Sequence, residues 1–356
     1  MKKYFLLSLF LVAGLMCTNA QMAYLLTEAS IAALPAENFN GVDQKPEQNA
    51  ANWFQTTYVT PNKGKFVSIA DLKAGLSTDV KVLWINIDRV GLPDLATAGL
   101  DVDAVAAVKS FVEKGGCLLL TKQAAHLSYQ IGRIGYEPTW NSGGYNVGGD
   151  IWKIKAQLGT DPNITTIDRS GHPIYNNLTT DADLLYPMVG AVARTDNNIY
   201  WGDLMRKDPN TGGPMAETDE TKAQGITHYQ NNNPLRLTDF ESDWAASMLA
   251  TWPHIQDFCI AQILELKAQN NFKGSITNIG FAAYQWGTAN DYIANVQKIT
   301  ENSLAYLLTQ STTTEVENVV VTPNDGRIFN ILGQPVDAEN AHNGIFIING
   351  QKVFIK

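Results

Sequence analysis

Cysteine is scarce in this chain of 356 residues, which contains only three. Cys17 belongs to an N-terminal segment discussed below, which leaves Cys117 and Cys259 for the rest of the protein. Two cysteines permit at most one disulfide bond, which excludes the cross-linked scaffold of small secreted domains. The fold must therefore depend on a hydrophobic core, and a chain of this length with 45% hydrophobic residues can form one.

Positive charge is also in short supply. Lysine and arginine number 26 against 35 aspartate and glutamate residues, which gives a formal net charge of −9. Such a chain lacks the basic surface that binds nucleic acid or anionic membranes, so we expect neither as a partner.

Long apolar runs are absent outside the N-terminus. Residues 1–20, MKKYFLLSLFLVAGLMCTNA, have the layout of a signal peptide: two lysines, an apolar run too short to span a bilayer comfortably, and small or polar residues. We therefore expect export to the cell surface or the medium, with a mature chain beginning at Gln21. Cys17 permits a rival interpretation as a lipid anchor, but Met16 stands where such sites have a small residue.

The first half of the main body predicts a parallel α/β sheet. Residues 81–87, KVLWINI, form the continuous apolar run of a strand covered on both faces. Residues 101–114 have helical spacing and end at a Gly-Gly pair, and residues 117–121, CLLLT, predict the next strand. This order is a βαβ unit. The buried face of the helix is expected to carry Val102, Val105, Val108 and Val112.

The second half is less regular. Residues 124–238 are rich in Gly, Asn, Asp and aromatic residues, which predicts long loops. Beyond them, residues 275–284 predict a strand, as residues 23–26 do at the start of the main body. Residues 254–269 predict a helix behind Pro253, with Cys259 facing the sheet. Residues 291–308 predict an amphipathic helix. Its buried side is expected to carry Ile293, Val296, Ile299, Leu304 and Leu307.

The C-terminal segment has the alternation of a small β-hairpin tail, residues 323–356, behind a polar linker, residues 311–322. It resembles the sorting tails of proteins exported by the type IX secretion system of Bacteroidetes, although an ordinary hairpin would show similar alternation. The resemblance implies outer-membrane export machinery as a partner. The matching residues are Phe329, Asn330, Gly333, Val336, Gly344, Phe346 and Lys356.

Residues 21–310 resemble the ThuA-like and class I glutamine-amidotransferase-like superfamily, including a Bacteroidetes family of unknown function. The matching pieces are LWINIDRVG (83–91), FVEKGGCLLLT (111–121), DRSGHPIY (168–175), ATWPHIQDF (250–258) and GFAAYQWGTANDYIANVQKITENSLAYL (280–307). The resemblance implies a flavodoxin-like three-layer sandwich with a mostly parallel sheet. It also links the chain to sugar metabolism and to glycan-uptake machinery, with fructans as one candidate ligand.

The nucleophile of the amidotransferases is missing. Their Gly-x-Cys-x-Gly turn places a cysteine after a strand, whereas Cys117 opens its strand. At ~3.3 Å per residue, His126 lies roughly 15 Å or more beyond that thiol, too far to share a proton with it. Cys117 is therefore predicted to be a core residue, which favours a non-catalytic role.

Asp88 and His126 are the candidate functional residues at the ends of strands. Each follows a predicted parallel strand, and ligands of open α/β sheets bind outside those carboxyl ends. An Asp/His pair could perform acid–base chemistry or bind a metal. The alternative is a capping Asp88 and a structural hydrogen bond from His126. We find no metal or phosphate motif in the sequence and expect no cofactor.

Aromatic residues in predicted loops and at strand ends suggest a carbohydrate site, because aromatic faces stack on sugar rings and Asn or Asp side chains bind hydroxyls. The sequence thus favours a non-catalytic protein that binds a glycan or oligosaccharide. The alternatives are a carbohydrate hydrolase using Asp88 and His126, and a structural component of the envelope. The predicted ligand-binding residues are Asp88, His126, Trp140, Tyr145, Trp152, Trp201, Tyr284 and Trp286, whereas Trp84, Trp244 and Trp252 are assigned to the core.

Overall fold

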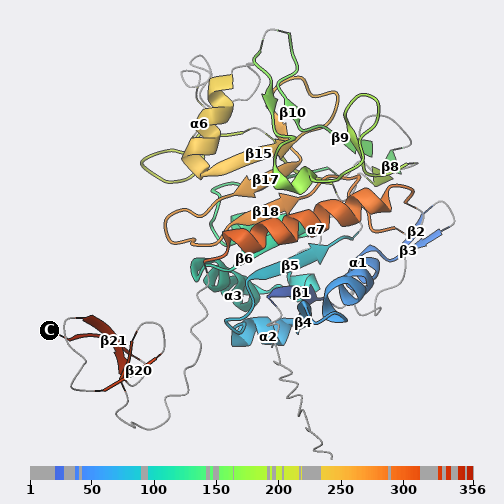
Figure 1. Ribbon diagram of the computed structural model, residues 1–356. Coiled ribbons are helices and arrows are strands. Elements are labelled where there is room, and N and C mark those ends of the chain that lie inside the picture. Colours follow the sequence, from blue (N-terminus) through green and yellow to red (C-terminus); the bar gives the residue numbers. More distant parts are fainter. Residues whose placement is uncertain are drawn as a thin grey trace, which may run out of the picture. The chain divides into compact units, whose positions relative to one another are not determined.

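The computed structural model consists of two compact units, Met1–Thr313 and Thr314–Lys356. Each unit is considered separately (Figure 1). The predicted signal peptide and most of the predicted linker lie outside the described residues. The structure describes residues 21–27, 37–39, 42–89, 95–141, 145–146, 152–162, 164–190, 193–194, 198–202, 204–215, 218, 234–287, 290–312, 328–330, 334–337, 344–348 and 351–355.

A seven-stranded, mostly parallel sheet forms the centre of the larger unit, as the sequence predicts. Five neighbouring strands are parallel, and the last two, β17 and β15, continue the sheet antiparallel. All six residues of β5 are buried, because helices cover both faces of the sheet. The spatial order is β15 (Ala246–Ala250), β17 (Ile263–Leu266), β18 (Ile276–Ile279), β6 (Cys117–Lys122), β5 (Val82–Ile87), β1 (Met22–Leu26) and β4 (Gly64–Ser68).

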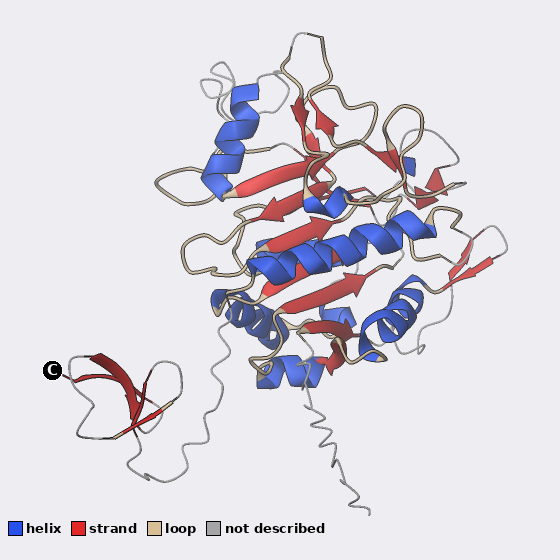
Figure 2. Cartoon of the chain, in the orientation of Figure 1, coloured by secondary structure: helices blue, strands red, loops and turns tan. Residues whose placement is uncertain are grey.

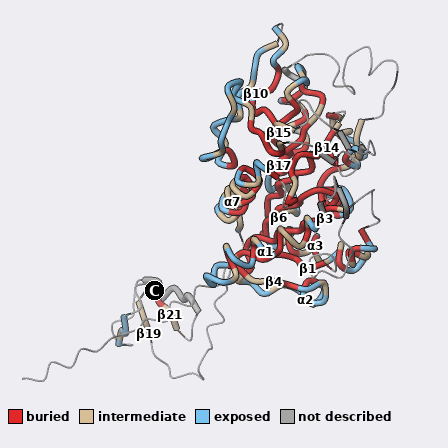
Figure 3. Tube along the Cα trace, turned by 90° about the vertical axis from the view of Figure 1, so that its right-hand side faces the viewer, coloured by how far each residue is buried: buried red, intermediate tan, exposed pale blue. Residues whose placement is uncertain are grey.

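Helices cover the two faces of the sheet and complete three layers (Figure 2). One face packs against α2 (Ile69–Ala74), α3 (Val102–Glu113) and α6 (Pro234–Trp244). The other packs against α1 (Pro46–Phe54), which continues as the π-helix η2 (Gln55–Val59), and against α7 (Ile293–Gln310). Apolar side chains from the sheet alternate between these two cores, and the buried residues gather along the sheet in Figure 3.

Helix α3 begins and ends where its sequence signals lie. Asp101 caps it by accepting a hydrogen bond from the backbone N–H of Ala104 at 3.1 Å, and Gly115 follows with φ +98°. Val108 and Val112 are buried as predicted. The prediction for Val102 is wrong: it occupies the first turn, and 80% of its surface is exposed.

Residues 254–269 do not form the predicted helix. They form two short strands, β16 (Ile260–Ala261) and β17, and all four residues of β17 are buried between β15 and β18. Cys259 is buried but lies just before β16 rather than on a helix. Helix α7, in contrast, forms with the predicted buried side, apart from Ile293, which is only partly buried.

The middle region is a set of short strands and turns, as predicted, followed by α6 and β15, which were not predicted. The backbone of β14 packs closely against Gly280. The N–H of Ile199 donates to the Gly280 carbonyl at 2.9 Å, and a Cβ on residue 280 would lie 2.1 Å from the Ile199 carbonyl oxygen. Only glycine allows that approach. The elements are β7 (Thr139–Asn141), β8 (Tyr145–Asn146), β9 (Lys153–Ile154), β10 (Gln157–Leu158), β11 (Ile167–Asp168), β12 (Tyr186–Pro187), β13 (Ala193–Arg194) and β14 (Asn198–Gly202).

Short elements are also found in the larger unit, and the described residues of the smaller unit form β-strands. The first group comprises the hairpin of β2 (Glu37–Phe39) and β3 (Val42–Gln44), the 3₁₀-helices η3 (Leu95–Ala98), η4 (Gln123–His126) and η6 (Pro173–Tyr175), and α4 (Leu127–Gln130). The smaller unit is a four-stranded antiparallel sheet, larger than the predicted hairpin, in the order β20 (Pro335–Val336), β19 (Ile328–Asn330), β21 (Gly344–Ile348) and β22 (Gln351–Ile355).

Candidate functional site

The strand order of the sheet indicates where a ligand would be expected to bind. The chain passes from β1 to β4 on one side of β1, and then to β5 on its other side. Ligands of open α/β sheets bind at such a reversal, outside the carboxyl ends of the strands. Thr27 follows β1 and Asp88 follows β5 at this edge. We refer to Thr27, Glu47, Asp88, Arg89 and Gln123 as the rim cluster.

Glu47 holds the rim cluster together. It lies in the first turn of α1, where a carboxylate is favoured by the helix dipole, and only 2% of its surface is exposed. Its Oε2 accepts from the Thr27 hydroxyl at 2.5 Å. Its Oε1 accepts from the Asp88 backbone N–H at 3.0 Å and from Arg89 Nε at 2.9 Å. With three donors on its two oxygens, Glu47 is an anchor that joins α1 to the ends of β1 and β5.

Gln123 fixes the backbone of Arg89 from the other side. Its Oε1 accepts from the Arg89 N–H at 3.3 Å, and its Nε2 donates to the Arg89 carbonyl at 2.7 Å. The guanidinium of Arg89 is therefore placed precisely at the rim, with 15% of the side chain exposed. Its orientation does not depend on a ligand, which is the preorganisation that a binding site requires.

Two buried nitrogen atoms beside Asp88 have no hydrogen-bond partner in the described part of the chain. They are Nη2 of Arg89 and Nδ2 of Asn86. The Asn86 Oδ1 is satisfied, because the Thr121 hydroxyl donates to it at 2.7 Å. A buried donor without a partner costs about 1–3 kcal/mol, so each of these N–H groups favours a water or a ligand oxygen.

Lys122 shapes the rim next to Gln123. Its backbone has φ +57°, which is uncommon for residues other than glycine and asparagine, and its side chain is completely buried. Its Nζ donates to the carbonyls of Phe281 and Ala282, both at 2.9 Å. The ammonium therefore ties the end of β6 to the segment that follows β18, and the change of backbone direction starts η4.

Asp88 lies on the face of the sheet covered by α1 and α7. It is 4% exposed, and its charge adds to the effect of burial in raising the pKa of Tyr284. The Tyr284 hydroxyl is 2.6 Å from the hydroxyl of Thr300 in α7. Asp88 and Tyr284, two of the predicted site residues, are thus close enough to interact, although Tyr284 belongs to the core.

His126 is separate from Asp88. No hydrogen bond or ion pair joins the two residues among the described interactions, so the predicted Asp/His pair does not form. Burial lowers the pKa of His126, and the negative charge of Glu137 opposes this shift only in part. The neutral imidazole keeps 7% of its surface exposed, and its Nε2 has no partner within the described chain.

Three of the predicted aromatic ligands belong to the hydrophobic core, which contradicts their assignment to a ligand-binding surface. Trp201 and Trp286 are 2% exposed and Tyr284 is fully buried. Trp286 joins Trp53 and Trp84 in an indole cluster, with ring centroids 5.1 Å and 5.6 Å from Trp286. These rings stabilise the fold and offer no free face for a sugar. Trp84, Trp244 and Trp252 are buried, as predicted.

Trp140 and Trp152 keep part of their surface exposed. Trp140 is in β7, opposite Ile199 of β14. Trp152 packs partly against the core, and its backbone carbonyl accepts from Met188 at 2.9 Å. Tyr145 is in β8, but its side chain lies outside the described residues. Of the predicted aromatic residues, Trp140 and Trp152 thus retain surface for a ligand.

Cys117 is a core residue, as predicted. Burial raises the pKa of its thiol to about 11, and its Sγ accepts from the Ser275 N–H at 3.3 Å. A thiol with that pKa is almost entirely protonated at neutral pH and is a poor nucleophile.

Sequence reasoning missed Glu47, Arg89, Gln123 and Lys122. Arg89 and Gln123 follow the same strands as Asp88 and His126, so their position after a strand was a usable signal. Glu47 follows Pro46 at the start of a helix that the sequence analysis did not predict.

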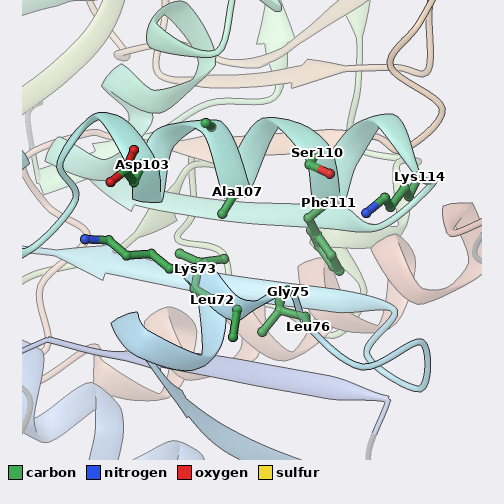
Figure 4. Close-up of a pocket in the computed structure, with 11 residues that line it drawn as sticks. Leu72, Lys73, Gly75, Leu76, Asp103, Ala107, Ser110, Phe111 and Lys114 are labelled. Atoms are coloured by element: carbon green, nitrogen blue, oxygen red, sulfur yellow. The ribbon is translucent and has the colours of Figure 1, made fainter.

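A groove lies apart from the rim cluster, between α2 and α3 (Figure 4). Its volume is about 580 Å³, and small side chains such as Ala107 and Ser110 form much of its α3 wall. Lys73 at the groove is paired with Asp101 at 2.6 Å. None of the sequence-predicted site residues lines it.

Neither a metal site nor a membrane helix is found in the part of the chain that the structure describes. No group of three or more His, Cys, Asp or Glu side chains there is arranged to hold an ion. No described helix combines the length and the apolar character needed to span a bilayer.

Comparison with known proteins gives similarity of structure only. No protein-family model and no curated protein matches the chain. One similar solved structure is a protein from Bacteroides uniformis described as ThuA-like, with 9% identity and a TM-score of 0.40 over 82% of this chain and 92% of that one. Another is Gan42B, a GH42 β-galactosidase, with 10% identity and a TM-score of 0.36 over 79% of this chain and 29% of that one. Similarity at this level carries no argument about function.

Proposed function

We propose that this chain is an exported, non-catalytic carbohydrate-binding protein whose ligand binds at the rim cluster, between the ends of β1 and β5. The observation that carries the proposal is the arrangement of Asn86, Asp88 and Arg89. Two buried N–H donors without a described partner belong to residues on either side of Asp88 in the sequence; Glu47 binds the guanidinium of Arg89, and Gln123 fixes its backbone.

A carbohydrate matches this arrangement because each sugar hydroxyl can donate and accept a hydrogen bond. The Asp88 carboxylate accepts, whereas Arg89 Nη2 and Asn86 Nδ2 donate. Charged groups strengthen such bonds and fix their geometry. Trp140 and Trp152 have exposed surface that could contact the apolar face of a sugar ring.

The geometry favours binding over hydrolysis. A glycosidase uses two carboxyl groups, one of which must donate a proton to the glycosidic oxygen. Near Asp88 the second carboxylate is Glu47, and its two oxygens already accept three hydrogen bonds. Asp88 also lacks the predicted pairing with His126.

Export and the ThuA-like resemblance belong to the same proposal. A signal peptide and a sorting-like tail would bring the protein to the cell surface, where a glycan-uptake system meets polysaccharides. The resemblance to a Bacteroidetes family supports such a setting, and fructans are one candidate ligand.

Affinity electrophoresis against a panel of plant and microbial polysaccharides, including fructans, tests the proposal. We expect at least one glycan to retard the protein, and Asp88→Asn to abolish most of the retardation, because it removes the negative charge and replaces one of two acceptor oxygens by an NH₂ donor. Trp140→Ala should weaken it. Asp103→Asn, which makes the same change on exposed α3, should behave as wild type.

Either of two results would overturn the proposal. Either no glycan retards the wild type, or Asp88→Asn is retarded as strongly as the wild type while its near-ultraviolet circular dichroism is unchanged.

A further inference from the structure

A second cavity, of about 320 Å³, lies apart from the rim cluster. It opens between the turn that follows α4 and the turn at residues 269–272, which leads toward β18. Aromatic, amide and basic side chains line it together with glycines. The lining residues are Tyr129, Gly132, Arg133, Ile134, Gly135, Lys207, Gly212, Trp244, Gln269, Asn270, Asn271 and Phe272.

The charge of this cavity is opposite to that of the whole protein. Among the described residues that line it, Arg133 and Lys207 are basic and none is Asp or Glu. The full chain has 35 acidic and 26 basic residues, so its composition predicts more acidic than basic side chains at such a surface.

Arg133 places a permanent positive charge in the wall. Only 3% of its surface is exposed, and burial lowers its pKa to about 10, so it remains charged at neutral pH. Its guanidinium donates to the carbonyls of Trp244 (2.9 Å), Ala245 (3.3 Å) and Lys267. No described carboxylate pairs with it, and its Nε has no partner among the described groups. Neutral carbonyls only partly balance a buried cation, which leaves a positive field in the cavity.

Lys207 adds a second cation at the wall. Its Nζ lies 5.2 Å from the centre of the Trp244 ring, a cation–π distance. Its backbone N–H, rather than its ammonium, binds Asp243 at 3.1 Å. The same Asp243 carboxylate forms an ion pair with Arg206 at 2.5 Å, not with the ammonium of Lys207. The ammonium of Lys207 is thus held by an aromatic face and can turn to a ligand anion.

The rest of the wall suits hydroxyl groups. Asn270 and Asn271 supply amides, and Tyr129 supplies an aromatic ring with 37% of its surface exposed. The Gln269 amide is already engaged: its Oε1 accepts from Arg133 Nη1 at 3.5 Å, and its Nε2 donates to the Asp243 carbonyl at 3.4 Å. A Cβ added at Gly132 or Gly212 would meet nothing within 4 Å, so the chain leaves open space beside both residues.

We propose that this cavity binds an acidic sugar, with the anionic group, a uronate carboxylate or a sulfate ester, near Lys207 and Arg133 and the hydroxyls on the amides. The proposal rests on this cavity alone and does not require the rim cluster to bind a glycan.

Calorimetric titration of the full chain tests the proposal with galacturonate, glucose 6-sulfate, neutral galactose and glucose, and inorganic sulfate. We expect the two acidic sugars to bind and the neutral ones not to. Raising the salt concentration should weaken binding, because ions screen the attraction. Inorganic sulfate should bind more weakly than the sulfated sugar, since it lacks the hydroxyls.

Variants at Lys207 locate the site without disturbing the buried Arg133. We expect Lys207→Glu to weaken binding of both acidic sugars about tenfold or more, because the change replaces an attraction by a repulsion. Lys207→Arg should keep most of the affinity. Lys109→Glu, the same charge change at an exposed position of α3, should leave the affinity for both acidic sugars unchanged.

The inference is overturned if neither acidic sugar binds, if neutral sugars bind equally well, or if inorganic sulfate alone reproduces the affinity. Asp88→Asn should leave this binding intact, which separates its failure from that of the rim cluster.

Discussion

His172 shows how burial decides the charge of a single residue. Its ring packs edge-on against Tyr306 at 4.6 Å, and its Nδ1 accepts from the Ile174 N–H at 3.4 Å. Burial, helped by the positive charges of Lys267 and Arg169, lowers its pKa to about 4. The imidazole is therefore neutral at pH 7, and its contact with Glu265 at 3.9 Å is not an ion pair. This residue fixes the turn at the start of η6.

The lowered pKa of His172 predicts a specific pH dependence of stability. The unfolded histidine titrates near pH 6.5 and the folded one near 4, so its contribution is complete above pH 6.5 and is lost as the pH falls toward 4. Between pH 7 and pH 4 we expect the free energy of unfolding of wild type to fall by about 2 kcal/mol more than that of His172→Gln. Urea unfolding at both pH values measures this.

Wild type measured beside His172→Gln at each pH provides the control, because every other titratable group is common to the two chains. Equal losses in wild type and His172→Gln would refute the assignment.

Residue positions at the rim were predictable, but the directions of their side chains were not. Asp88 continues the alternation of Trp84 and Asn86 along β5 and so faces the α1 and α7 side. His126 comes after Lys122, whose positive φ redirects the chain into a 3₁₀ turn. The sequence CLLLTKQAAH does not predict the positive φ of Lys122, because lysine rarely adopts that backbone conformation. The predicted pair therefore separates.

At the scale of the element, α3 shows that helical spacing alone does not define a buried face. Val102 and Val108 share the predicted stripe, yet the first is 80% exposed and the second fully buried. The first turn lies beyond the contact with the sheet, and the side chains of Ala104, Phe111 and Val112 complete the buried face.

Truncation of the two valines should separate them clearly. Val108→Ala opens a cavity in the core and is expected to lower the free energy of unfolding by about 2 kcal/mol. Val102→Ala removes an exposed side chain and should change it by less than about 0.5 kcal/mol. Urea denaturation of both variants measures the difference. Similar losses for the two would show that the first turn is packed after all.

Elements with a clear period were predicted and those without one were not. Strand β5 and helix α7 formed as predicted, because one is continuously apolar and the other has a regular stripe. Residues 254–269 contain the segment ILEL, apolar except for Glu265, which suits a helix or a doubly paired strand equally well. Pairing with β15 and β18 decides between them, and that information lies far away in the sequence.

At the scale of the molecule, the described residues of both hydrophobic cores belong to the larger unit. Both apolar clusters, one on each face of the sheet, are formed by residues before position 313. The predicted α/β architecture is correct because it follows from such buried strands, whereas α6 and the order of the strands depend on contacts between distant residues.

A chain that ends after Thr313 should consequently unfold at the same temperature as the full chain, within about 2 °C. Differential scanning calorimetry measures this. A chain that ends after Thr300 loses the buried Leu304 and Leu307 and should not fold. A large drop in melting temperature for the first truncation would mean that the smaller unit stabilises the larger one.

The indole cluster of Trp53, Trp84 and Trp286 also has an optical consequence. Ring centroids 5.1–6.0 Å apart allow the excitation energy absorbed by one indole to pass to the other two. Asn49, one turn of α1 before Trp53, binds the carbonyl of Trp286 at 2.7 Å, and Glu47 begins the same helix at the rim. A ligand that displaces this end of α1 would change the colour of the protein's own fluorescence and report its binding without a label.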